Sequence, residues 1–166
     1  MSRVYKHDLR VGVGNTVEYG IYSSIKMNNP NFITFIVTAE SKSTLERMIS
    51  KERLRDICQC EEFTISNRED LDNTFSICEQ TLRSLFSSGF TPSDIIVDIT
   101  SGTKIMSAAI ASVAILYKLY SITYVGGVRD EAGIVIQGSE KPKEIKPMQI
   151  LYRHELNLIK KYFSIF

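Results

Sequence analysis

Two spacings of hydrophobic residues alternate along the chain. Short runs of β-branched and aromatic residues, such as 31–38 and 94–98, indicate buried strands. Between them, apolar residues recur every three or four positions over 70–86, which predicts an amphipathic helix. The predicted strands are 10–14, 31–38, 61–66, 94–98, 121–125 and 133–137, and the predicted helices are 17–26, 41–56 (capped by Ser41 or Ser43), 70–86 (capped by Asp70 or Asp72), 105–120 and 151–162. This alternation is typical of a sheet with helices on both faces.

The last strand is expected to reverse direction. Residues 126–132, which end in the turn Arg129–Ala132, separate the last two predicted strands, and this connection is too short for a parallel crossover. The residues that follow, 138–146, are polar and charged, and we expect them to be mobile. We therefore predict an α/β, Rossmann-like fold with a mainly parallel sheet, helices on both faces and a C-terminal antiparallel hairpin. The domain would span residues 1–150, and residues 151–166 would form a C-terminal helix that covers the sheet or reaches a partner.

Composition narrows the classes of function. The 166 residues suit one domain, and 43% of them are hydrophobic, as in ordinary globular proteins. Lys and Arg number 20 against 19 Asp and Glu, whereas proteins that coat long nucleic acid carry a clear basic excess. We therefore expect no long nucleic acid as a partner. A small anionic ligand held by local groups remains compatible with this charge.

The cysteines and the apolar runs indicate in which cellular compartment the protein is expected. Cys58, Cys60 and Cys78 are odd in number and lack the spacing of disulfide or zinc sites, so we expect structural thiols in a reducing, cytoplasmic compartment. The longest apolar stretch, 105–117, is shorter than the roughly 20 residues of a membrane span and predicts a buried helix instead. The N-terminus lacks the apolar core of a signal peptide. We expect no metal and no cofactor.

The segment Asp98–Lys104 carries the clearest candidate chemistry. It joins a buried strand to a helix, and ligands of open α/β sheets bind at the carboxyl ends of strands. The helix N-terminus and Lys104 suit a phosphate, and Ser101 and Thr103 can donate hydrogen bonds. Asp98 would repel a phosphate, so we expect its carboxylate to orient the loop by accepting backbone N–H groups. The same residues also fit an ordinary capped turn, and their order excludes a Walker A motif.

Two further loops could line the same site. Asn15 and Thr16 follow the first predicted strand, although Val17 stands where a dinucleotide fingerprint needs its third glycine. Gly127 and Arg129 follow the fifth predicted strand, where the glycine leaves space and the arginine could stack on a base or pair with a phosphate. A hairpin turn with an exposed arginine explains this second pair equally well.

The segment Asp98-Ile99-Thr100-Ser101-Gly102-Thr103-Lys104-Ile105-Met106 resembles the D-x-T-G-G-T-K-x-M motif of CARF domains, with Ser101 in place of the first glycine. The resemblance implies binding of a cyclic oligoadenylate, the second messenger of type III CRISPR complexes, with cyclic tetra-adenylate favoured. It also implies a homodimer with one ring across its two-fold axis. The ligand contacts expected on this basis and from the two further loops are Asn15, Thr16, Thr100, Ser101, Gly102, Thr103, Lys104, Met106, Gly127 and Arg129.

Three functions follow from this resemblance and from the fold. The first is a sensor in antiviral defence that controls an effector domain or membrane segment lying outside this chain, or an associated effector. The second is a ring nuclease that cleaves its ligand without metal, with Lys104, Thr103 and Ser101 stabilising the charge as a ribose 2′-hydroxyl attacks the adjacent phosphate. The third is a generic Rossmann nucleotide-binding enzyme. The sequence leaves open the ring size, ligand cleavage and the identity of any effector.

Overall fold

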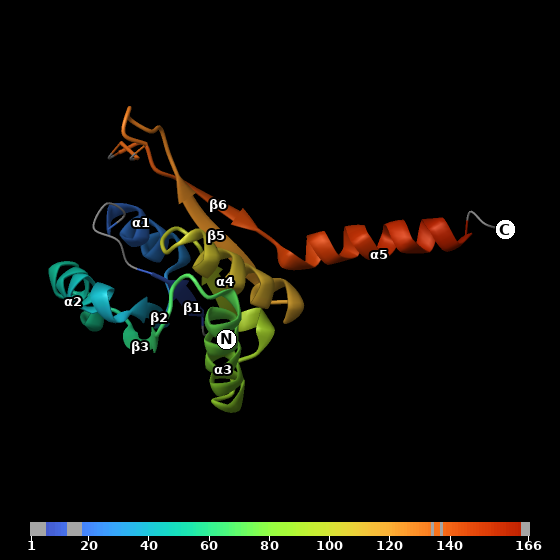
Figure 1. Ribbon diagram of the computed structural model, residues 1–166, viewed down its shortest axis with the longest axis horizontal. Helices are drawn as coiled ribbons and strands as arrows, with labels where there is room; N and C mark the ends of the chain where they lie inside the picture. The colour runs from blue at the N-terminus through green and yellow to red at the C-terminus, as the bar shows by residue number, and fades with distance from the viewer. Residues whose placement is uncertain (1–5, 13–17, 134, 137, 164–166) are drawn as a thin grey trace, which may run out of the picture.

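A six-stranded sheet forms the centre of the protein (Figure 1). The computed structural model describes residues 6–12, 18–133, 135–136 and 138–163. The strand order is β3-β2-β1-β4-β5-β6, and all neighbours run parallel except β5 and β6. The strands are β1 (His7–Val11), β2 (Phe32–Thr38), β3 (Gln59–Ile65), β4 (Ile95–Asp98), β5 (Ser121–Gly126) and β6 (Lys141–Ile145).

Helices cover both faces of this sheet. The helices are α1 (Glu18–Asn28), α2 (Lys42–Lys51), α3 (Leu71–Ser87), α4 (Lys104–Leu116) and α5 (Pro147–Phe163), with single 3-10 turns at Ala39–Ser41, Leu54–Asp56 and Pro92–Asp94. Two separate hydrophobic cores show the layering, because one is built on α3 and α4 and the other on α1 and α2. The predicted Rossmann-like α/β class is therefore confirmed.

Strand β2 illustrates why its sequence forms a buried strand. Ile33, Phe35 and Val37 enter the core under α1 and α2, whereas Ile36 enters the core under α3 and α4. All four side chains are at most 1% exposed. A strand covered on both faces needs apolar residues at consecutive positions, which is the pattern seen over 31–38.

The sixth strand was predicted in the wrong place. Among the described residues of 133–137, Val135 forms an isolated bridge with Arg129, and β6 lies in the stretch expected to be mobile. Its sequence, KPKEI, is exposed at every position and has one apolar residue outside proline, so it carries no strand periodicity. Backbone pairing with β5 at the edge of the sheet forms this strand, and an edge tolerates Pro142. The antiparallel direction of the last pair was predicted correctly.

Several element boundaries also differ from prediction, each for a local reason. The first strand begins at His7 rather than residue 10 and ends before Gly12, which has a φ of 72°. Helix α2 stops at Lys51 rather than residue 56, because Arg53 adopts a left-handed φ of 51°. Helix α3 begins as expected, with the Asp70 side chain accepting a hydrogen bond from Asn73 N at 2.9 Å.

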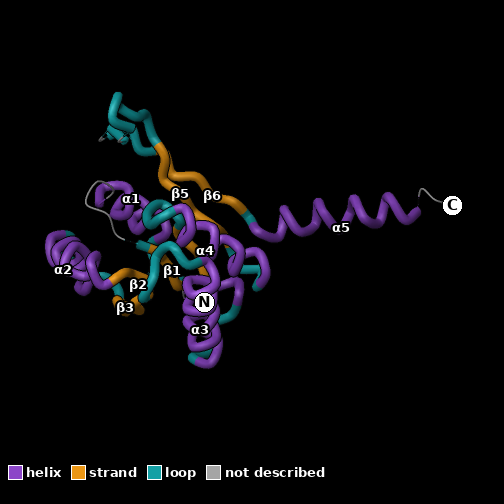
Figure 2. Tube along the Cα trace, in the orientation of Figure 1, coloured by secondary structure: helices purple, strands orange, loops and turns teal. Residues whose placement is uncertain are grey.

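Helix α5 leaves the body of the domain (Figures 1 and 2). It begins at Pro147, which is buried, and every residue from Tyr152 to Phe163 is exposed. It touches α4 near its base, and its far part extends away from the sheet. Within the described part of the chain, no helix is both long and apolar enough to cross a membrane.

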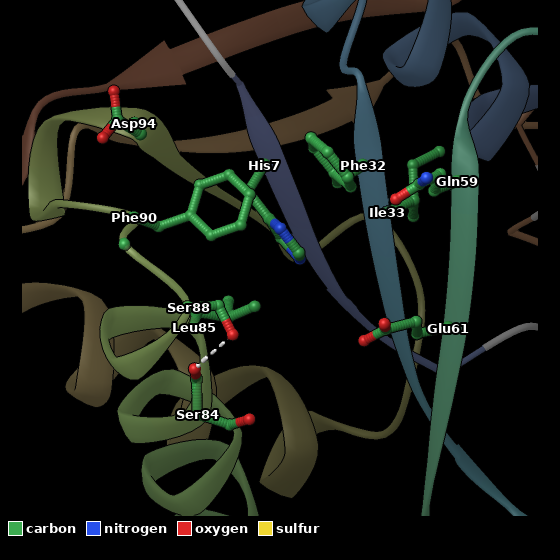
Figure 3. A pocket seen from close by; sticks show the side chains of 11 residues that line it. His7, Phe32, Ile33, Gln59, Glu61, Ser84, Leu85, Ser88, Phe90 and Asp94 are labelled. Carbon is green, nitrogen blue, oxygen red and sulfur yellow. Dashed lines mark hydrogen bonds between the residues drawn. The ribbon is translucent and has the colours of Figure 1, made fainter.

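At the amino ends of β1, β2 and β3 there is a cavity of about 650 Å³, far from the carboxyl ends of the strands (Figure 3). Figure 3 shows the rings of His7 and Phe90 next to each other where β1 faces the end of α3, with centroids 4.9 Å apart. His7 Nε2 pairs with Thr34 Oγ1 at 2.8 Å. Only 3% of His7 is exposed, and this burial lowers its pKa from 6.5 to about 4.

The buried imidazole makes stability depend on pH. Because the folded-state pKa lies below the unfolded-state value, the unfolded chain binds the proton first as the pH falls. The contribution of His7 is thus complete above pH 6.5 and is lost between pH 6.5 and about 4. We expect this group to remove about 3 kcal/mol of unfolding free energy over that window, measured by urea denaturation at a series of pH values.

A His7→Gln variant should lose this part of the pH dependence. Exposed His154 on α5 supplies the matched control, since His154→Gln should keep the wild-type profile. An identical pH profile in wild type and His7→Gln would contradict the prediction.

Candidate functional site

The candidate site lies where the direction of the strand connections changes. The chain leaves β1 toward β2 on one side, and it leaves the adjacent strand β4 toward β5 on the other side. Two neighbouring parallel strands whose connections diverge leave a crevice beyond their carboxyl ends, and this is where open α/β sheets bind ligands. The segment after β1 and the segment 98–104 after β4 meet at this point.

Two glycines bring these segments into backbone contact. A Cβ atom on Gly12 would lie 2.6 Å from Gly102 N and closer still to Gly102 Cα, a separation that real Cβ atoms do not show. Both residues have a positive φ, 72° for Gly12 and 93° for Gly102. Gly12 N also donates to Ile36 O at 2.7 Å. Glycine at residue 12 is therefore required by both space and conformation.

Asp98 orients the loop, as predicted. Its Oδ1 accepts from Thr100 N at 3.0 Å, and its Oδ2 accepts from Thr100 Oγ1 at 3.2 Å. The same carboxylate accepts from Thr123 Oγ1 on β5 at 2.9 Å and from Ser24 Oγ on α1. Only 2% of Asp98 is exposed. The carboxylate thus faces the protein interior and holds the loop to β5 and α1.

A fully buried arginine compensates the charge of this carboxylate. Arg10 lies between two acids, with Nη1 3.4 Å from Asp98 Oδ1 and Nη2 bonded directly to Asp8 Oδ2. Asn28 Nδ2 donates to Asp8 Oδ2 at 3.0 Å, and Arg10 Nη2 donates to Ser24 Oγ at 3.1 Å. Burial raises the pKa of Asp8, against the lowering effect of Arg10. We call Asp8, Arg10, Ser24, Asn28, Asp98 and Thr123 the Arg10 cluster.

The loop is also fixed to its neighbours through hydroxyl groups. Thr100 Oγ1 accepts from Val125 N on β5 at 3.0 Å. Thr103 is the N-cap of α4, with Oγ1 accepting from Met106 N at 3.2 Å and donating to Arg68 O at 3.0 Å. The first turn of α4 therefore starts at the crevice, and the segment after β3 is joined to it.

Lys104 and the backbone of Arg68 lie at this edge of the sheet. Lys104 is exposed at the first position of α4, and Gly102, two residues before it, is exposed as well. Arg68, 59% exposed, is brought beside Thr103 by its own carbonyl and was not predicted from the sequence. The signal available was its place after a parallel strand, because the carboxyl ends of parallel strands share one edge.

Ser101 and Met106 have their side chains inside the protein. Ser101 is 7% exposed, and its Oγ has no hydrogen-bond partner among the described residues. Met106 is 2% exposed and packs in the core beneath α3 and α4. The burial of Met106 accounts for an apolar residue at this position and disfavours a side-chain contact with a ligand.

Contacts within the hairpin explain why glycine stands at residue 127 and where the Arg129 side chain lies. A Cβ atom on Gly127 would lie 2.8 Å from Ser139 Oγ, because the two sides of the loop pack closely there. Arg129 donates to the Gly133 carbonyl and to Tyr124 Oη, the latter at 3.3 Å. Their roles as ligand contacts stay predictions. Asn15 and Thr16, also predicted as contacts, lie outside the described residues.

Comparisons with known proteins agree with this geometry. A family model described as the Card1 CARF domain matches residues 21–154. Can2 from Sulfobacillus thermosulfidooxidans, solved in complex with cyclic tetra-adenylate, superposes with a TM-score of 0.58 at 16% identity, over 72% of this chain and 32% of that chain. Protein VC1899 from Vibrio cholerae superposes with a TM-score of 0.60 at 15% identity, over 72% of this chain and 30% of that chain. No curated protein matches the sequence.

At these identities the two solved structures show the fold alone. This chain spans about a third of the length of each of them. The family match covers most of the chain and includes the whole segment 98–104.

The contact between the two glycines can be tested with a matched pair of alanine variants. Gly12→Ala meets both a positive φ and the backbone of Gly102, whereas Gly89→Ala meets a φ of 94° with nothing within 4 Å. We expect Gly89→Ala to cost about 1–2 kcal/mol of unfolding free energy and Gly12→Ala clearly more. Amide chemical shifts of residues 101–103 should move only in Gly12→Ala. Equal costs with unchanged shifts would show that the two segments do not touch.

The buried charges of the Arg10 cluster lead to a second testable prediction, on stability. Arg10→Met leaves two buried carboxylates without their cation and should cost about 3–5 kcal/mol of unfolding free energy in urea denaturation. The control is Arg47→Met, which removes an ion pair to Glu18 from an arginine that is 57% exposed. That change should cost at most about 1 kcal/mol. A similar, small cost for both variants would contradict the arrangement of the cluster.

Proposed function

The chain belongs to the Card1 CARF domain family, and we propose that it binds a cyclic oligoadenylate at the crevice between β1 and β4 as a sensor in type III CRISPR signalling. The resemblance of the segment 98–106 to CARF domains is thereby confirmed. Membership of this family makes the alternative hypothesis, a generic Rossmann nucleotide-binding enzyme, weaker. The observation that supports this site most directly is the contact of Gly12 with Gly102, which brings the residue directly after β1 against the segment 98–104 that leads into α4.

The chemistry of this edge suits a phosphodiester ligand. Helix α4 offers the N–H groups and positive dipole end of its first turn, and Lys104 adds an exposed charge beside them. The segment after β3 contributes the backbone carbonyl of Arg68 to this edge, while the Arg68 guanidinium lies 3.6 Å from Glu69 Oε1. Asp98, the nearest acid in the loop, is turned inward and paired with Arg10, so it presents little opposing charge.

The ligand and the assembly follow from the shape of the messenger. A cyclic tetra-adenylate has two-fold symmetry, so a single ring bound by two identical chains requires a homodimer. Cyclic tetra-adenylate is the favoured ring, and the complex of Can2 with that molecule supports this choice. Can2 is about three times as long as this chain's match to it, so an effector would lie outside these residues or on an associated protein.

Lys104→Ala tests the proposal. Calorimetry with cyclic tri-, tetra- and hexa-adenylate should show one ring bound per two wild-type chains, with cyclic tetra-adenylate tightest. Removal of a charged hydrogen bond typically costs about 1.5–3 kcal/mol, so Lys104→Ala should weaken binding by about ten- to a hundredfold. Lys118→Ala, just beyond the other end of the same helix, should bind as wild type does.

The outcomes separate the elements of the proposal. Binding of no ring would refute cyclic oligoadenylate sensing at this site. Binding that Lys104→Ala and Lys118→Ala weaken equally would place the ligand elsewhere. One ring per chain, with monomers in analytical ultracentrifugation, would refute the proposed dimer but would still support the binding of a cyclic oligoadenylate.

Ring cleavage is a second candidate function. Lys104 lies exposed at the start of α4, where it could stabilise charge on a phosphate attacked by its neighbouring 2′-hydroxyl, whereas the Thr103 hydroxyl donates to Arg68 O. Among the described residues, His7 lies at the amino ends of the strands and His154 on α5, so neither is placed as a proton acceptor for this loop. The same incubations, analysed by chromatography in excess EDTA, would show linear products if the ring is cleaved.

A further inference from the structure

Two cysteines lie in contact at the start of the edge strand β3. Cys58 precedes the strand at a bend of the chain and Cys60 is its second residue, so their side chains share one side of the backbone. Their Sγ atoms are 3.8 Å apart. A disulfide needs about 2.05 Å, and the bend at Cys58 is where the backbone can adjust to close that difference.

The two thiols differ in the way a reactive pair requires. Cys60 is partly exposed, whereas Cys58 is 8% exposed. The hydrogen bond from Cys58 and the positive charge of Arg55 lower the pKa of Cys60. The hydrogen bond to Cys60 and burial raise the pKa of Cys58. Cys60 is therefore the attacking thiol, and Cys58 stands next to it as a second thiol that can resolve a mixed disulfide.

Small molecules can approach this pair from the edge of the sheet. Among the described strands, β3 pairs only with β2, which leaves its outer side open. A hollow of about 630 Å³ is lined by Arg55, Cys58 and Cys60. The guanidinium of Arg55 lines that hollow and is paired with Glu46 Oε1 at 3.1 Å, so a carboxylate of a glutathione-type molecule would add to this exposed ion pair or replace it.

We propose that Cys58 and Cys60 form a modification site for low-molecular-weight disulfides of the glutathione type. The Cys60 thiolate attacks one sulfur of the oxidised disulfide, forming a mixed disulfide and releasing one thiolate. The Cys58 thiol, on losing its proton, then attacks Cys60 Sγ and releases the second thiolate. Two protein thiols are oxidised to one disulfide, and one small disulfide is reduced to two thiols.

The experiment incubates the reduced, full chain with oxidised glutathione, followed by alkylation of the remaining thiols and tryptic mapping. Cleavage at Arg55 and Arg68 places both cysteines on one peptide, 56–68, and Cys78 on another. We expect peptide 56–68 to lose two hydrogens and to carry no alkyl group. Cys78 is the internal control, because it is 0% exposed and burial raises its pKa to about 12.

Two variants complete the test. Cys58→Ser should stop at a glutathione adduct on Cys60, and Cys60→Ser should leave Cys58 reduced. In the folded wild type, Cys60 should react at least about tenfold faster than Cys78. A stable glutathione adduct on wild-type Cys60, or reaction of Cys60 no faster than Cys78, would overturn the proposal. Circular dichroism of each variant before oxidation shows that the fold is intact.

Discussion

The site depends on a positive charge placed inside the protein. Arg10 is the register partner of Asp98 across β1 and β4, and its guanidinium sits between that carboxylate and Asp8. Burying three charged groups costs desolvation energy, which only close pairing and further hydrogen bonds offset. Ser24 and Asn28 of α1 supply some of those bonds, and Thr123 of β5 supplies another. These bonds thus hold strands β1, β4 and β5 and helix α1 in one relative position. A shift of one residue along the chain would replace the bonded side chains by others that cannot form the same bonds.

In the segment 98–104, some residues bond to the protein itself and others remain available to a ligand. The Asp98 carboxylate pairs with Arg10, and Thr100 Oγ1 accepts from Val125 N. Thr103 Oγ1 accepts from Met106 N and donates to Arg68 O. Gly102 and Lys104 remain exposed at the surface of the crevice. A loop whose polar side chains are already committed keeps its shape without ligand, so binding there needs little ordering of the loop.

Much of this arrangement follows from the sequence. The apolar runs of β2 and β4 and the three- and four-residue steps of α3 predicted three elements, and the polar segment after β4 marked the crevice. β6 could not be predicted, since its side chains carry no pattern and its pairing with β5 is a backbone property. Arg68 was missed because a hydrogen bond between residues 35 positions apart brings it to the loop. The close approach of Gly127 to Ser139 inside the hairpin could not be predicted either, and the role of Gly127 as a ligand contact stays a prediction.

The free helix at the end of the chain gives the fold a mechanical property. Thr100 binds β5 through Val125 N, β5 pairs with β6, and β6 continues through Lys146 into α5. At about 1.5 Å per residue, the 17 residues of α5 reach about 25 Å from that junction. A rotation of about 10° at its base therefore displaces its tip by about 4 Å, given that length. Helix α5 begins at the end of the sheet opposite the crevice, because Ile145 is paired with Ile122 at the start of β5, so a change at the crevice would reach it along the length of β5 and β6 and be enlarged to about a side-chain diameter at its tip.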